Sequence, residues 1–367
     1  MRSIIVTDDT KFEELQNSWS VLAEKSGIPN IFLTHEWLWT WWRHLKGNRK
    51  LFLVTVYEDA QLVGVAPLML CKEYGFRRLK FISSQFADFE DFIIASDESK
   101  REEIIETILK TIYQTKGWDI FRLQGIKESS PNFPVFKRFA SGRRDFRVCI
   151  QEHQEGAPFL EISQTWEDYS KTLRRKLFTD TKRNTNLLQK EGEIQFGEAK
   201  LGGLEDLDRM LDEHFRFHQM RRNSLDTVSV MERKETCDFF RAVARQFLEK
   251  GWLRFHWMSV NRDFASAHFG FFYQKHFFYY LPSFNESFKR FSVGRILLLK
   301  FLEESFRARV ERFDFMAGEE VYKKNFNPAV EKLYFLNVSA NCFRGRLGDF
   351  ALNRIYLSIK KLLGKKW

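Results

Sequence analysis

The chain lacks the features that mark secreted, membrane-spanning and metal-binding proteins. Its four cysteines, Cys71, Cys149, Cys237 and Cys342, are far apart and form no Cys-x-x-Cys or Cys/His cluster. This spacing excludes a disulfide scaffold and predicts unpaired thiols without a structural metal site. No apolar run approaches the roughly 18–20 residues of a spanning helix, and the start, MRSIIVTDDTKFEEL, has no long apolar segment of a secretory signal. We therefore expect a cytoplasmic protein that binds no metal.

Aromatic residues, by contrast, are abundant. The 367 residues include 39 Phe and 10 Trp, and 44% of the chain is hydrophobic while 29% is charged. This composition is typical of a globular protein in which the phenylalanines mostly fill the core. The length exceeds what one hydrophobic core usually supports, so two domains of ordinary size are expected.

Much of the net charge of +10 is concentrated in two segments. Seven basic residues and one acid lie between Arg344 and Trp367, and KTLRRKLFTDTKRN (171–184) is a second basic cluster. Both segments suit an anionic partner, namely a phosphorylated cofactor, a lipid surface or an RNA, and the alternative is a solvated basic face. We expect residues 346–367 to form a basic amphipathic helix that either lies on an anionic membrane or docks on the preceding domain.

The two halves of the chain repeat one order of elements, which is strand, turn, strand, a further aromatic strand, helix and strand. The matching segments are the hairpins 51–70 and 253–272, the helices 100–117 and 294–310, and the strands 118–125 and 311–318. Apolar residues in both helices recur at helical spacing. We therefore predict an α/β (α+β) fold of two tandem domains, 1–155 and 156–345, each a mixed, mostly antiparallel sheet flanked by helices.

The two halves differ most at the start of their matching helices. The first start, IASDESKREE (94–103), is acidic, and carboxylates there already neutralise the positive end of the helix dipole. The second start, NESFKRFSVGR (285–295), carries cations and a glycine, which suits a pyrophosphate unless the glycine is only a turn residue. The residues predicted to form this phosphate site are Lys289, Ser292, Val293, Gly294, Arg295 and Ile296.

These residues resemble the coenzyme A loop of the GNAT acyltransferases, Gln/Arg-x-x-Gly-x-Gly/Ala, to which KRFSVG (289–294) is similar. The BioF-like and CelD-like branch of that superfamily is a closer match. FSVGRILL resembles its Pro-rich glycine loop, FDFMAGEEVYKKNF resembles its DFxxGxExYKxxW segment, and FLTHEWLWTWWRHL resembles its N-terminal FxSxxWLxxWW. The resemblance covers about residues 1–340 and implies tandem GNAT-like domains, with acyl-CoA bound in the second domain and the acceptor on the side of the first.

This branch is in turn similar to the FemAB transferases, which take an acyl group from charged tRNA. A lysine in their Phe-Lys-Lys segment is thought to stabilise the oxyanion, and this role would fall here on Lys323 or Lys324. Two residues depart from the branch pattern: Val293 replaces a usual proline and Phe326 a usual tryptophan. These departures bear on the shape of the substrate more than on the chemistry.

Acyl transfer to an amine needs a proton acceptor, donors for the oxyanion and aligned reactants. Glu319, at the end of a predicted strand next to Gly318, is the first candidate to act as the base or to hold the acceptor amine. Gly318 and Lys324 are candidate substrate-binding residues. Tyr322 can protonate the leaving thiolate, and His268 is an alternative base. Each of these residues, like Lys323 and Lys324, has a purely structural interpretation, which stays open.

In the first half, the acidic loop SSQFADFEDFII places Asp88 and Asp91 where they could face the acceptor amine, or simply be solvated. The leading hypothesis is an acyl-CoA-dependent N-acyltransferase that acts on a sugar, lipid or peptide precursor of the cell envelope or an exopolysaccharide. It would be cytoplasmic or peripheral at the inner face of the membrane. A FemAB-like transferase that uses aminoacyl-tRNA and a non-catalytic scaffold of polysaccharide assembly are the alternatives.

Overall fold

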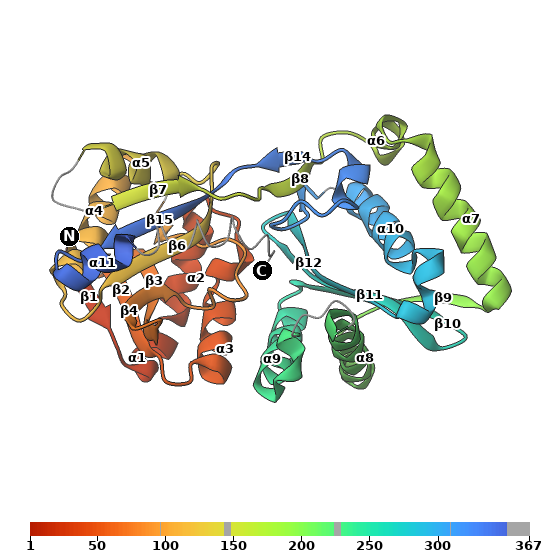
Figure 1. The fold of residues 1–367 in the computed structure, drawn as a ribbon, viewed down its shortest axis with the longest axis horizontal. Coiled ribbons are helices and arrows are strands. Elements are labelled where there is room, and N and C mark those ends of the chain that lie inside the picture. The colour runs from red at the N-terminus through yellow and green to blue at the C-terminus, as the bar shows by residue number, and fades with distance from the viewer. Residues whose placement is uncertain (96, 143–147, 224–228, 309, 351–367) are drawn as a thin grey trace. The chain divides into compact units, whose positions relative to one another are not determined.

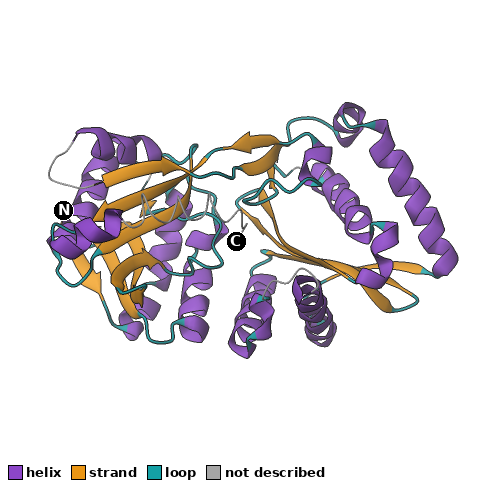
Figure 2. Cartoon of the chain, viewed as in Figure 1, coloured by secondary structure: helices purple, strands orange, loops and turns teal. Residues whose placement is uncertain are grey.

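The computed structural model describes residues 1–95, 97–142, 148–223, 229–308 and 310–350 (Figures 1 and 2). The chain forms two compact units. Unit 1 comprises Met1–Gln154 together with the residues from Lys332 onward, and unit 2 comprises Glu155–Glu331. All four cysteines are free thiols.

Unit 1 is built on a mixed sheet in the order β1-β2-β3-β4-β6-β15-β7, with the short β5 paired to β3. The strands are β1 (Arg2–Val6), β2 (Lys50–Glu58), β3 (Gln61–Glu73), β4 (Phe76–Phe81), β5 (Ile93–Ile94), β6 (Ile120–Lys127), β7 (Val148–Glu152) and β15 (Leu333–Ser339). The helices are α1 (Asp9–Glu14), α2 (Gln16–Lys25), α3 (His35–Leu45), α4 (Glu98–Gln114), α5 (Phe133–Gly142) and α11 (Phe343–Phe350), with a 3-10 turn η1 (Ile31–Leu33).

Unit 2 is built on a second sheet in the order β14-β8-β13-β12-β11-β10-β9. The strands are β8 (Ala157–Glu161), β9 (Ile194–Glu198), β10 (Leu253–Val260), β11 (Asp263–Tyr273), β12 (His276–Phe284), β13 (Arg312–Asp314) and β14 (Ala329–Glu331). The helices are α6 (Trp166–Thr172), α7 (Arg175–Glu191), α8 (Leu204–Asn223), α9 (Lys234–Glu249) and α10 (Val293–Arg307). Three 3-10 turns complete it, η2 (Val230–Glu232), η3 (Glu286–Phe291) and η4 (Lys323–Phe326). Helices α8 and α9 cover one face of the sheet, and α10 and α7 lie on the other (Figure 1).

Five strands of each sheet, β1-β2-β3-β4-β6 and β9-β10-β11-β12-β13, have the same order and connectivity, which confirms the predicted tandem α/β fold. In each unit a three-stranded antiparallel meander (β2-β3-β4 or β10-β11-β12) leads into one helix (α4 or α10) and then a strand. That strand, β6 or β13, pairs in parallel with the third strand of its meander. The buried aromatic and aliphatic residues recur at strand or helix spacing in both units. The sequence pattern therefore predicts the order of strands and helices.

The C-terminal limit predicted for the second domain, residue 345, is wrong. Strand β15 lies in unit 1, where it pairs with β6 on one side and β7 on the other. The chain therefore crosses between the units twice, after Gln154 and after Glu331. The predicted basic helix 346–367 lies mostly outside the described residues, which include only its first part, the end of α11. No helix within the described ranges is both long enough and apolar enough to cross a membrane.

Candidate functional site

The start of α10 leaves backbone donors without partners inside the helix. Ser292, the residue before the helix, has a left-handed backbone (φ 52°), and its side chain makes no capping hydrogen bond. The N–H groups of Arg295 and Ile296 donate to the Ser292 carbonyl at 2.9 and 3.2 Å. Those of Val293 and Gly294 have no acceptor within the helix, as expected for a first turn. Together with the helix dipole they form a donor set for an anion.

A pocket of about 320 Å³ opens directly at this helix start. It brings together six residues singled out from the sequence: Lys289, Ser292, Val293, Gly294, Arg295 and Tyr322. The remaining wall consists of Arg221, Tyr279, Pro282, Phe284, Leu298, Asn325 and Phe326. Its described lining contains no carboxylate, so the charged side chains around the pocket are all cationic.

Diverging strands create this pocket. Strands β12 and β13 pair in parallel only from His276 to Phe278, opposite Arg312 to Asp314. Beyond these pairs β13 ends, while β12 continues to Phe284 and contributes Tyr279, Pro282 and Phe284 to the pocket wall. The gap between the strands is bounded by α10 and by η4, which supplies Asn325 and Phe326.

The cations around the pocket are differently engaged. Lys289 pairs with Glu286 at 2.9 Å on its own 3-10 turn, and the Arg221 guanidinium lies over the Phe284 ring at 4.7 Å. Arg295 has a buried Nε atom without any partner among the described residues. A buried guanidinium nitrogen without an acceptor is costly for the protein alone, so it suits an anionic ligand.

Gly294 is not required by the protein's own packing. A Cβ atom built there would meet only the Ser266 Oγ, at 4.0 Å, and the backbone of Gly294 is not left-handed. The open space next to this residue, the unpaired donors and Arg295 fit a pyrophosphate lying against the helix start. This pattern is the one that the sequence predicted for coenzyme A.

Two tyrosines lie on the wall of the pocket. Tyr279 is buried, and burial raises the pKa of its hydroxyl. Tyr322 is 38% exposed, yet desolvation also raises the pKa of its hydroxyl, and nearby Tyr279 and Glu320 add to the effect. Both hydroxyls therefore stay protonated at neutral pH and can act as hydrogen-bond donors.

A family model described as an acetyltransferase (GNAT) domain matches residues 175–324. Residues 175–324 are therefore similar to an acetyltransferase (GNAT) domain. The matched span begins at the first residue of α7 and ends inside η4, so it includes α10 and the strands β9 to β13. It contains the wall of the pocket except for Asn325 and Phe326, which follow the span directly.

Solved structures show that the fold of the whole chain has relatives. FemX superposes with a TM-score of 0.62 at 10% identity, covering 92% of this chain and 97% of that chain. The C-terminal domain of a putative lysylphosphatidylglycerol synthetase from Agrobacterium fabrum gives 0.58 at 10% identity, covering 96% and 97%. L-PGS from Bacillus licheniformis gives 0.57 at 10% identity, covering 95% and 97%. At these identities the likeness shows the fold alone. A search of curated protein sequences found no match.

Lys323 is placed for a structural role rather than for the predicted oxyanion contact. Its buried ammonium group donates to the carbonyls of Met316, Ala317 and Gly318 at 3.3, 3.2 and 2.9 Å, and it pairs with Glu320 at 2.7 Å. The loop 316–318 is therefore held by Lys323, whose donors are used within the protein. Lys323 does not line the pocket within the described residues.

His268 and Ile296 also differ from their predicted roles. The Ile296 side chain is buried in the core beneath α10 and does not contribute to the pocket wall. His268 is 1% exposed, and its ring stacks on Tyr279 with centroids 4.1 Å apart. Burial holds the pKa of His268 well below its usual value. The structure does not support either residue in direct contact with a ligand, because both lie behind the wall.

Three other predicted residues lie near the end of β13 but outside the pocket lining. Gly318 is held in the loop by hydrogen bonds, since its N–H donates to the Gly156 carbonyl at 3.0 Å. Glu319 and Lys324 are exposed. These two side chains remain proposals for the acceptor side, because the pocket does not contain them.

The acidic loop of unit 1 is structural. Asp91 is buried and accepts hydrogen bonds from the Phe92 N–H at 2.7 Å, the Asn132 amide at 2.8 Å and the Ser130 hydroxyl at 2.5 Å. Asp88 is half-buried, and its backbone carbonyl packs against Gly125. The prediction that Asp91 faces an acceptor amine is not supported, because its carboxylate is already bonded within the protein.

Several residues of the pocket wall are not among the site residues predicted from the sequence. Arg221 lies near the end of α8, far before α10 in the chain, and Tyr279 is one of many aromatic residues in β12. Asn325 and Phe326 directly follow the Lys-Lys pair and were within the segment that carries the family resemblance. Nothing in the local pattern marks Arg221, because only the tertiary fold brings α8 to this pocket.

Proposed function

We propose that this chain transfers an acyl group from an acyl-CoA to an amino group of a sugar, lipid or peptide precursor. One observation carries the proposal: the pocket between β12 and β13 ends at the uncapped start of α10, where Arg295 has an unpaired buried nitrogen. The GNAT match over residues 175–324 supports acyl transfer as the reaction class.

Each group of residues in the pocket would have a separate role in binding and reaction. The N–H groups of Val293 and Gly294 and the Arg295 side chain bind the pyrophosphate, and Lys289 adds positive charge. Bound acyl-CoA supplies a thioester carbonyl for attack by the amine. The Tyr322 hydroxyl keeps its proton at neutral pH and can donate a hydrogen bond to the leaving thiolate, which then takes up a proton from solvent.

The proton of the acceptor amine must be accepted by a group outside the pocket wall, because no carboxylate or histidine is among the described residues of that wall. We propose Glu319 for this role, since it is exposed in the loop that follows β13. Glu319→Gln should lower kcat most at low pH, where less of the free amine is present. An unchanged pH profile would instead favour water as the acceptor.

A second candidate donor is an aminoacyl-tRNA. The fold likeness to FemX over 92% of the chain supports it, together with the sequence resemblance to the FemAB transferases. The cationic pocket would then receive the phosphates of the RNA end in place of those of coenzyme A.

A binding experiment separates the two donors. We would measure the melting temperature with acyl-CoAs of increasing chain length, and separately with aminoacyl-tRNA at low salt. Gly294→Glu, which places a carboxylate at the helix start, should abolish stabilisation by acyl-CoA. Gln16→Glu adds the same charge on the exposed surface of α2 and serves as the control. No stabilisation by any acyl-CoA at millimolar concentration would contradict the proposal, and stabilisation by tRNA alone would favour the second candidate.

A further inference from the structure

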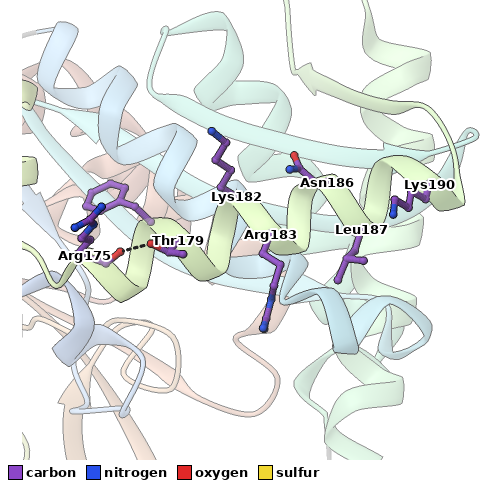
Figure 3. Close-up of a pocket in the computed structure, with 8 residues that line it drawn as sticks. Arg175, Thr179, Lys182, Arg183, Asn186, Leu187 and Lys190 are labelled. Carbon is purple, nitrogen blue, oxygen red and sulfur yellow. Dashed lines mark hydrogen bonds between the residues drawn. The ribbon is translucent and has the colours of Figure 1, made fainter.

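Helix α7 has two opposite faces of different character. Leu177, Asn184 and Leu188 are buried on the inner face, where α7 packs toward α10 and η3. The opposite, outer face carries cations, and Figure 3 shows these side chains projecting from the helix. The residues of this outer face are Arg175, Thr179, Lys182, Arg183, Asn186 and Lys190, with Phe178 and Leu187 at its edges, and together they line a surface hollow of about 530 Å³.

The four cations of the outer face, Arg175, Lys182, Arg183 and Lys190, are exposed, and none of them forms an ion pair with another described residue. Helical geometry spreads them over about 22 Å at a rise of 1.5 Å per residue.

The two acids of α7 do not neutralise this face. Asp180 is half-buried and is not among the residues that line the outer face, and Glu191 pairs with Arg290 at 2.8 Å. The outer face therefore presents a positive stripe along the helix.

The shape of this stripe favours a flat partner. Exposed side chains on one face of a helix follow a line along it, so all four cations can reach a flat anionic bilayer at the same time. An RNA duplex offers no such plane, and its narrow major groove does not admit side chains. Single-stranded RNA is usually bound through exposed aromatic rings, and the outer face has only the half-buried Phe178. Leu187, which is 42% exposed, adds an apolar group that suits a membrane interface.

We propose that the outer face of α7 binds the surface of a membrane that contains anionic phospholipids. The contact is electrostatic, with Arg175, Lys182, Arg183 and Lys190 meeting the lipid phosphates. This inference does not depend on the proposed acyl transfer, because vesicle binding can be measured without any donor or acceptor.

The experiment is co-sedimentation of the full chain with vesicles. One set contains phosphatidylglycerol in phosphatidylcholine, and the other contains phosphatidylcholine alone. We expect binding to the anionic vesicles only, and weaker binding as salt is raised. The double variant Lys182→Gln with Arg183→Gln should lower the association constant for anionic vesicles roughly 30-fold, because each cation near the surface contributes about a factor of five. The control, Lys25→Gln with Lys72→Gln, removes the same charge from exposed positions of unit 1.

Equal melting temperatures would show that both double variants fold. The proposal is overturned if the wild-type chain does not bind anionic vesicles, or if the control and the α7 variant lose the same affinity. It is also overturned if the α7 variant keeps its vesicle binding but loses retention of RNA, which would make RNA the partner of this face.

Discussion

The two units share one fold but treat the gap between their parallel strands differently. In unit 1, β4 and β6 pair over only three residues, as β12 and β13 do in unit 2. The segment after β4 then fills the gap. The Glu90 N–H donates to the Gln124 carbonyl at 3.2 Å, the Glu90 carboxylate accepts from the Gln124 N–H at 2.7 Å, and the Gln124 amide donates to the Ser84 carbonyl. In unit 2 the corresponding gap is the pocket.

The starts of the matching helices α4 and α10 also differ, since only the start of α4 is bonded by the protein's own side chain. Asp97 caps α4 by accepting a hydrogen bond from the Ser99 N–H at 3.0 Å, whereas Ser292 does not cap α10. In unit 1, the protein's own residues therefore fill the gap between the parallel strands and bond the N–H groups at the helix start. In unit 2, the gap and these N–H groups are left open. A duplicated fold with one closed and one open copy favours a ligand site in the open copy, because only there are donors and space both unused.

The largest expected difference between the units is their response to acid. Burial lowers the pKa of His214 to about 3 and that of His218 to about 4, both in unit 2. The unfolded chain binds more protons than the folded one between these values and about 6.5, so unit 2 loses stability as the pH falls. At pH 5 the two histidines should cost about 4 kcal/mol together. In unit 1, burial raises the pKa of Asp91 to about 6, which stabilises that unit as pH falls from 6 toward 4.

Urea denaturation at pH 7.5 and pH 5, with a brief protease pulse and mass spectrometry to identify the cleaved unit, tests this prediction. Unit 2 should unfold at lower urea at pH 5, and His214→Gln should reduce the change. If unit 1 unfolds first in acid, the contrast in buried titratable groups does not govern stability.

Making the start of α10 resemble that of α4 should remove the anion site. Ser292→Asp places a carboxylate next to the free N–H groups, and repulsion should weaken acyl-CoA binding roughly 100-fold. The measurement is isothermal titration calorimetry. Asp97→Ser is the reciprocal control and should leave the affinity unchanged. An affinity that survives Ser292→Asp would place the donor elsewhere.

The stability of the loop 316–318, which follows β13 in unit 2, depends on Lys323. Lys323→Met removes the donor to three carbonyls, and we expect a loss of about 2 kcal/mol in the free energy of unfolding. Lys324→Met, at an exposed neighbour, should change stability little. If Lys323→Met kept full stability but lost kcat, the predicted catalytic role would regain support.

The smallest change separates ligand contact from turn formation at Gly294. Gly294→Ala should leave stability within about 1 kcal/mol, since a Cβ there meets nothing closer than 4.0 Å. A pyrophosphate against the same position would be displaced by the methyl group, and we expect roughly tenfold weaker binding. Thermal unfolding and titration of the same sample check both parts. Unchanged binding would make Gly294 an ordinary turn residue.

The sequence by itself determined the repeated order of elements, the contrast between the two helix starts and six of the thirteen residues that line the pocket at α10. These features are local, because helix periodicity, caps and turn residues act over a few neighbouring residues. It also led to Ile296 and Lys323 as ligand contacts, since local spacing does not reveal which side of a helix or loop is buried.

Tertiary structure alone decided the rest. It placed β15 in unit 1, brought Arg221 and Tyr279 to the pocket wall and enclosed the Asp91 loop within unit 1. Each of these outcomes depends on pairing between segments far apart in the chain. Such pairing is set by which buried surfaces and backbone groups can be satisfied together, and a linear pattern does not contain that information.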